Sequence, residues 1–181
     1  MKLADTPTGY GPLSVLNHWV IGSLVIVIIA LGLMSAGMEG RSPRRSEIIG
    51  LHKSLGTILL LLAAWRIFWR LKQGFPAPSQ DHPTWQHRAA FAMHWLLMIA
   101  ILMMPLSGLL WSLYGGRDVS VFGLFSIPAL GDYEALSDMA SQFHRLFSKA
   151  LISAIGLHAL IGVYSASTDY SKTGGRMFKV D

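Results

Sequence analysis

Histidines are the residues of this sequence best suited to chemistry, because the chain has seven of them and no cysteine. Four of them, His18, His52, His144 and His158, lie within long apolar stretches. An ionisable side chain is costly in such surroundings and usually serves a function there. Fourteen residues, or nearly four helical turns, separate His144 from His158, so both project from one helix face about 21 Å apart along the axis. This spacing predicts two centres at different depths.

Four apolar windows, each long enough to span the hydrocarbon core of a bilayer, would position these side chains: residues 13–37, 50–71, 89–113 and 142–165. The composition agrees, with 52% hydrophobic and 14% charged residues and a mean hydropathy of +0.44. Short links between spans favour alternating helix directions. We therefore predict an all-α fold, an integral membrane four-helix up-down-up-down bundle formed by a single domain over residues 1–181. The longest link, residues 114–141, is expected to be a partly packed surface loop.

Antiparallel threading brings the four histidines together in two pairs, His18 with His158 and His52 with His144. Cofactor sites in helical bundles are built from such inward-facing side chains, and an iron porphyrin takes two axial nitrogens from opposite sides. A flat macrocycle also needs space beside its ligand, and residues four positions apart share a helix face. The residues four positions after the histidines are all small: Gly22, Gly56, Ser148 and Gly162. The pattern predicts two b-type haems.

Two other interpretations of these histidines are less consistent with the sequence. A single intramembrane histidine can simply hydrogen-bond across helices, but four at matched depths argue against that for the set. A zinc or copper site would need further ligands close by, and no carboxylate or methionine is arranged beside the pairs. The absence of cysteine also excludes covalently attached c-type haem and iron–sulfur clusters. The haem must be held non-covalently, by four iron ligands.

Three further residues are candidates for the inner cofactor site. His94 lies in the third span and could replace His18 as the partner of His158, or could orient a quinone. Arg66 and Arg70 close the second span, where they could hold haem propionates, line a quinone pocket or anchor the helix at the interface. No residue is assigned as catalytic in its own right.

The charge distribution predicts the surroundings and the orientation of the bundle. The net charge of +5 is modest and its basic residues gather at span ends, which indicates anchoring to lipid and not nucleic-acid binding. With Arg145 and Lys149 set aside because they fall inside the fourth span, eight basic residues lie on the side of the termini and five on the other. The excess of basic residues on the cytoplasmic side of membrane proteins places both termini in the cytoplasm.

The order of several short motifs resembles the bacterial cytochrome b561 family over nearly the whole chain. The matching stretches are Leu16-Asn17-His18-Trp19, Leu51-His52-Lys53-Ser54-Leu55-Gly56, Arg66 with Arg70, His94, Pro105-Leu106-Ser107-Gly108, Phe122-Gly123, Ile127-Pro128, His144 and Gly156-Leu157-His158. The resemblance implies a di-haem b cytochrome of the bacterial inner membrane, with His18, His52, His144 and His158 as ligands. The chain departs from the family at Ser165-Ala166, where relatives often carry a further histidine pair.

The same resemblance implies electron exchange with ubiquinone or ubiquinol, and one branch of the family oxidises superoxide at the outer surface. As an enzyme the chain would then be an oxidoreductase, superoxide:ubiquinone or quinol-linked. Arg41, Arg44, Arg45 and Lys53 could attract the superoxide anion, or could contact headgroups or propionates instead. Two alternatives stay open: a quinol-oxidising cytochrome that reduces a periplasmic redox protein, and a non-catalytic haem-binding membrane protein.

Overall fold

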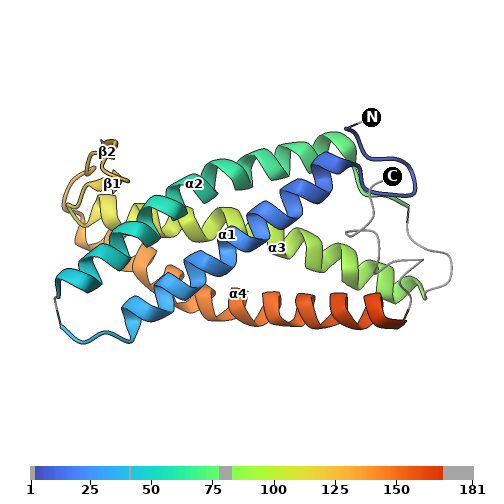
Figure 1. Cartoon of the computed structure of the whole chain (residues 1–181). Helices are drawn as coiled ribbons and strands as arrows, with labels where there is room; N and C mark the ends of the chain where they lie inside the picture. Colours follow the sequence, from blue (N-terminus) through green and yellow to red (C-terminus); the bar gives the residue numbers. More distant parts are fainter. Residues whose placement is uncertain (1–2, 41, 78–82, 169–181) are drawn as a thin grey trace.

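Four long helices run back and forth along a common direction in the computed structural model, which describes residues 3–40, 42–77 and 83–168 (Figure 1). Their bounds are α1, Pro12–Ala36; α2, Pro43–Gln73; α3, Thr84–Tyr114; and α4, Glu134–Thr168. All four are long and apolar enough to cross a membrane. The predicted up-down-up-down bundle of membrane-spanning helices is confirmed. We call the end where α1 and α3 begin the N-terminal end of the bundle.

The helices α2, α3 and α4 are longer than the apolar windows predict, chiefly because polar turns continue them beyond the expected spans, whereas α1 has the predicted length. α2 begins at Pro43, where Ser42 Oγ accepts a hydrogen bond from the amide of Arg45 at 3.2 Å. Such a cap, with proline in the first turn, is a favourable helix start. α4 begins at Glu134, whose negative charge suits the positive end of the helix dipole. Hydropathy locates the bilayer and not the helix ends.

The link after α3 was expected to be a surface loop, but it forms a β-hairpin. β1, Val119–Val121, pairs antiparallel with β2, Phe125–Ile127. The hairpin lies at the end of the bundle opposite the N-terminal end, beside the first half of α2 (Figure 1). We call this the hairpin end.

The packed core lies in the middle of the bundle, where Ile21 and Val25 of α1 meet Leu59 and Ala63 of α2 and Ile101 of α3. In the described part of the chain, extended helix packing joins only helices that are consecutive in sequence. α4 therefore packs along α3, and its Ile155 packs against the core cluster. Toward α1 and α2, the histidines of α4 lie beside His18 and His52.

Several basic residues used to predict orientation lie outside the described residues, namely Lys2, Arg41, Lys172, Arg176 and Lys179, as does His82.

Candidate functional site

The histidine pair at the hairpin end joins α2 to α4. The ring centres of His52 and His144 are 6.2 Å apart and their planes are 85° apart. An imidazole nitrogen lies about 2 Å from a bound metal ion and about 1.1 Å from its own ring centre, so two ligands on opposite sides of one metal have ring centres about 6 Å apart. The separation of this pair fits one metal ion between the rings.

Backbone carbonyls orient both rings of this pair. His52 Nδ1 lies 3.0 Å from Ile28 O, and His144 Nδ1 lies 3.1 Å from Met104 O and 3.1 Å from Ser107 Oγ. A carbonyl can only accept, so each Nδ1 carries the proton and each Nε2 keeps its lone pair. Histidines that bind metals usually donate their other ring N–H in this way, which fixes the tautomer and the ring orientation.

Two glycines make room for these rings. A methyl carbon added at Gly32 of α1 would lie 3.1 Å from His52 Cε1, and one added at Gly108 of α3 would lie 3.0 Å from His144 Cε1. Both distances are below the usual contact of about 3.5–4.0 Å between carbon atoms. The spacing of the histidines does not predict a role for Gly32, Ser107 or Gly108, although Ser107 and Gly108 lie in one of the family motifs. The available signal was a pair of glycines within runs of large apolar residues.

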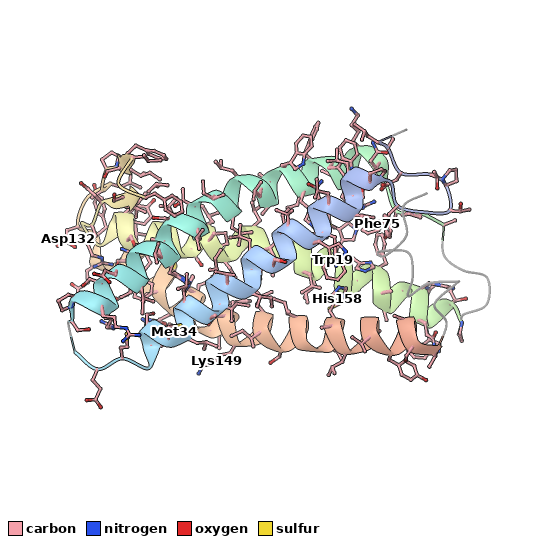
Figure 2. All side chains as sticks on the ribbon, viewed as in Figure 1. Trp19, Met34, Phe75, Asp132, Lys149 and His158 are labelled. Atoms are coloured by element: carbon pink, nitrogen blue, oxygen red, sulfur yellow. The ribbon has the colours of Figure 1, made fainter. Side chains whose placement is uncertain are left out.

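The second histidine pair lies toward the N-terminal end and joins α1 to α4. The ring centres of His18 and His158 are 6.2 Å apart and their planes are 61° apart. Figure 2 labels His158 toward this end of the bundle, with Asp132 at the other. This separation equals that of the first pair, so it also fits a metal ion between two imidazoles.

A third histidine belongs to the same cluster. The ring of His94, on α3, is 5.8 Å from that of His158, and it stacks on Phe75 at 5.7 Å with 13° between the planes. The structure therefore brings both predicted rivals, His18 and His94, to His158. The ring centres of His18 and His94 lie 6.2 Å and 5.8 Å from that of His158, so both are within reach of a group bound beside it.

Arg66 and Arg70 differ in what they contact. Arg66 donates to His18 Nδ1 across 3.3 Å. That contact needs an unprotonated Nδ1, whereas ligation of a metal through Nε2 needs the proton on Nδ1, so Arg66 and a metal compete for the tautomer of His18. Beside this site Asn17 Nδ2 is buried and has no hydrogen-bond partner among the described residues, which leaves a donor for a bound carboxylate.

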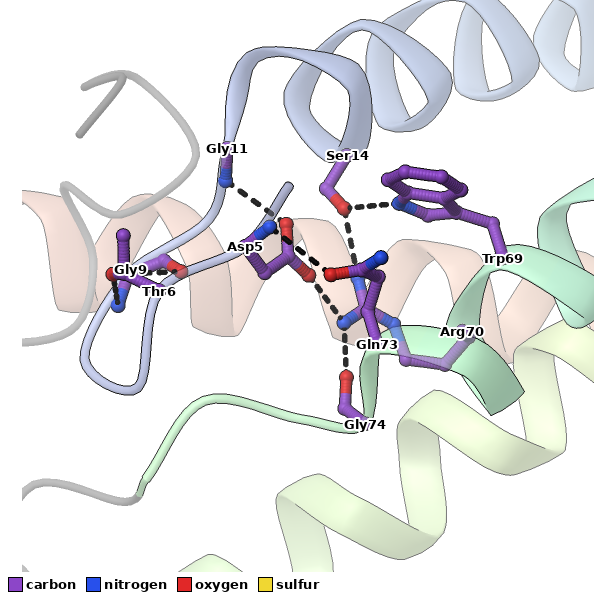
Figure 3. A network of polar contacts seen from close by, with 9 residues as sticks. All are labelled: Asp5, Thr6, Gly9, Gly11, Ser14, Trp69, Arg70, Gln73 and Gly74. Carbon is purple, nitrogen blue, oxygen red and sulfur yellow. Dashed lines mark hydrogen bonds and ion pairs between the residues drawn. The ribbon is translucent and has the colours of Figure 1, made fainter. Parts of the chain in front are cut away.

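Arg70 is held by the segment that precedes α1 (Figure 3). It forms an ion pair with Asp5 at 2.9 Å, and it also donates to Gly74 O and to Ser14 Oγ. Both charged side chains are at most 10% exposed. Asp5 also accepts a hydrogen bond from the amide of Gly11. The Arg70 guanidinium also lies 5.0 Å from the ring of Phe75, which stacks on His94, whereas Arg66 is the arginine that contacts His18 directly.

Basic side chains also surround the hairpin-end pair. Arg45 donates to Ser35 O at 3.1 Å, which ties the start of α2 to the end of α1. Arg145 lies over the ring of Trp111 at 5.4 Å, and that ring is 6.1 Å from His144. The predicted cationic cluster consists of Arg41, Arg44, Arg45 and Lys53, and of these Arg41 lies outside the described residues. Acidic residues also lie at this end, namely Glu39, Glu47, Asp118, Asp132, Glu134 and Asp138. Any attraction of an anion is therefore local to the individual cations and does not come from the net charge of this end.

The donor set fits an iron porphyrin better than a metal held by protein alone. Among the described residues no three His, Cys, Asp or Glu side chains converge as a metal site. Two nitrogens cannot complete a tetrahedral or octahedral shell, so the remaining ligands must come with the cofactor. A methyl group added at Gly22, Gly56 or Gly162 would meet no protein atom within 4 Å. Open space at these positions is compatible with a macrocycle, and equally with lipid at the exposed Gly22 and Gly162.

Comparison with known proteins gives one family over almost the entire chain. A family model described as prokaryotic cytochrome b561 matches residues 9–179. Cytochrome b561 homolog 2 of Escherichia coli (strain K12) is 29% identical over 178 residues, covering 98% of this chain and 95% of the relative. Cytochrome b561 homolog 1 of the same organism is 23% identical over 146 residues, covering 78% and 81%. A probable superoxide oxidase CybB of Yersinia pestis is 28% identical over 153 residues, covering 83% and 85%.

Proposed function

Because this chain belongs to the prokaryotic cytochrome b561 family, whose members bind b-type haem and transfer electrons across membranes, we propose that it holds two b haems and exchanges electrons between the periplasmic side and the ubiquinone pool. The observation that carries the proposal is the equal separation of 6.2 Å in two histidine pairs. One pair lies near each end of the apolar spans, so the two sites together cross the bilayer.

At the hairpin end, His52 and His144 are proposed as the residues that would hold the haem iron. Ile28 O and Met104 O hold the proton of each ring on Nδ1, and Gly32 and Gly108 let the rings lie against α1 and α3. When bound, the haem iron supplies a one-electron ferric/ferrous couple. The protein contributes the orientation of the ligands and the apolar surroundings.

At the N-terminal end, His18 and His158 are proposed as the second ligand pair. Arg66 must then leave His18 Nδ1, and a haem propionate is the acceptor that its chemistry favours, because guanidinium pairs with carboxylates. His94 lies beside the same site and is proposed to face the quinone. This chain has Ser165-Ala166 where relatives often carry a histidine pair. Of the two described imidazoles beside His158, His18 is proposed as a ligand, so His94 remains to exchange a proton with the quinone.

Superoxide is proposed as the electron donor at the hairpin end. One relative is named a probable superoxide oxidase, and the cations Arg45, Lys53 and Arg145 lie at this end of the helices. A positive field raises the encounter rate of a small anion. Two superoxide anions would lose one electron each to become two dioxygen molecules, and one ubiquinone would take up those two electrons and two protons to become ubiquinol.

The proposed location is the bacterial inner membrane with both termini in the cytoplasm. Arg66, Arg70, Lys72 and Arg88 lie at the ends of α2 and α3 nearest the N-terminal end. Basic residues close to span ends favour the cytoplasmic side. The hairpin end would then face the periplasm, and ubiquinone would react near the cytoplasmic surface.

Stopped-flow mixing of the oxidised protein with superoxide, and of the reduced protein with ubiquinone, tests the proposal. We expect superoxide to reduce the haem faster than it disproportionates, and ubiquinone to reoxidise it. Haem reduction by ubiquinol but not by superoxide would instead support a cytochrome that delivers electrons to a periplasmic protein. Haem that reacts with none of these substrates would support a non-catalytic haem protein.

A further inference from the structure

The hairpin between α3 and α4 carries an apolar tip. Residues 119–130 include no charged side chain, although Asp118 and Asp132 flank them. Val119 and Val121 of β1 are 1% exposed and pack inward. At the tip of the hairpin, by contrast, the apolar side chains are exposed: Leu124 is 83% exposed, and its neighbours Phe122 and Phe125 are also exposed.

Hydrogen bonds show that this hairpin turns back along α2 and does not project away from the bundle. Its base is attached to the end of α3, where the amide of Leu130 donates to Leu113 O at 3.0 Å. Its tip is attached to Ser54 of α2, whose hydroxyl accepts from the amide of Phe122 at 3.0 Å and donates to Ser120 O at 3.2 Å. Ser54 is 3% exposed, so these bonds are shielded from water.

The depth of the tip follows from Ser54. Ser54 lies four residues inside the apolar window of residues 50–71, or about 6 Å at 1.5 Å per residue. Its neighbour Lys53 is charged, as is typical of a residue near the headgroups. The tip is therefore level with the edge of the apolar span.

The backbone of the turn is strained in a way that keeps an aromatic ring at the tip. Phe122 has φ 52° and the following Gly123 has φ 73°. Glycine adopts positive φ readily, but a bulky residue does so at a cost. Strained residues that persist in a fold often serve a function. The Phe122 side chain is 46% exposed, so burial in the protein core does not explain its presence.

We infer that the tip formed by Phe122, Leu124 and Phe125 inserts into the lipid leaflet at the hairpin end, where it contacts acyl chains next to the headgroups. Large apolar side chains are stable at this boundary, and aromatic rings are common there. A docking surface for a soluble redox protein would need charged and polar groups around the apolar ones. The charged residues nearby, Asp118 and Asp132, lie at the base of the hairpin and not around its tip.

The absence of cysteine allows a direct test with single labels on the full-length haem protein. Leu124→Cys and Phe125→Cys would each carry a nitroxide, in vesicles of phosphatidylethanolamine and phosphatidylglycerol. Power saturation compares collisions of the label with oxygen, which concentrates in lipid, and with a water-soluble nickel chelate. Leu33→Cys, on α1 and 59% exposed, is the lipid-facing reference, and Glu39→Cys, exposed after α1, is the aqueous reference.

Both tip labels are expected to give an oxygen-to-nickel collision ratio severalfold above that of Glu39→Cys and close to that of Leu33→Cys. Ratios at both tip positions that match Glu39→Cys would overturn the inference and would leave the tip free for a soluble partner. Unchanged haem absorption in each labelled protein verifies the fold. Because the two tip positions are both exposed, loss of folding in one still leaves the other to decide.

Discussion

Replacement of Gly108 by alanine should weaken haem binding at the hairpin end. The added methyl carbon would lie 3.0 Å from His144 Cε1 and 3.2 Å from Nδ1. Ordinary contact between such atoms requires about 3.5–4.0 Å, so the ring must retreat by about 0.5–1 Å. That movement also stretches the bonds from His144 Nδ1 to Met104 O and Ser107 Oγ, each 3.1 Å long.

The size of the effect can be bounded. Overpacking of this kind costs about 1–3 kcal/mol. If the ligand ring bears that cost when the haem binds, the affinity falls roughly 5-fold to 100-fold, since about 1.4 kcal/mol corresponds to a factor of ten. The same range is typical when a group that orients a metal ligand is lost.

Titration of haem into the apoprotein, followed by its absorption, measures this affinity for each site. Gly50→Ala is the matched control, because a methyl group there would meet no protein atom within 4 Å and the residue is an exposed helical glycine. Both variants gain the same helix propensity from alanine. Wild-type affinity at both sites in Gly108→Ala would refute the argument that the glycine seats the His144 ring.

Three further outcomes are expected. Alanine at each of the four paired histidines should remove one of the two haems, whereas His94→Ala should keep both. The haem content is counted as pyridine haemochrome per protein, and one haem in His94→Ala would identify His94 as a ligand. Asp5→Ala should lower the free energy of unfolding by about 3–5 kcal/mol, because it leaves the buried Arg70 without its ion-pair partner. Thermal unfolding is compared with that of Asp138→Ala, which changes an exposed carboxylate, and equal stabilities would contradict a structural role for the ion pair. Gly56→Leu should reduce haem content, because a Cβ at this position meets no protein atom within 4 Å and a leucine would extend from it into the space proposed for the macrocycle. Full haem content would argue against a macrocycle there, and thermal unfolding of the apoprotein checks that the variant folds.

Much of the architecture could be predicted because it depends on local properties of the chain. Uninterrupted apolar windows locate membrane spans, and short links fix their alternating directions. The structure places His18 beside His158 and His52 beside His144, as antiparallel threading predicts. Helix periodicity and rise were sufficient for that result, since they set both the face and the depth of a residue.

The surroundings of the histidines could not be predicted in the same way. Arg70 and Arg66 occupy similar positions four residues apart, yet Arg70 pairs with Asp5, 65 residues away in sequence. Gly32 and Gly108 contact rings from other helices, so their role depends on how α1 and α3 are rotated. The hairpin was missed because its strands are only three residues long and lie in a segment without a clear alternation of polar and apolar residues.

The sequence by itself therefore determined that this is a membrane-spanning bundle with histidines at two depths, since hydropathy and helical repeat are properties of consecutive residues. Only the tertiary structure decided which arginine contacts His18 directly, which carbonyls orient the rings and where the hairpin lies. Those features depend on side-chain directions and on contacts between distant segments. Hydrogen bonds form within a few tenths of an ångström, a precision that spacing along the chain cannot supply.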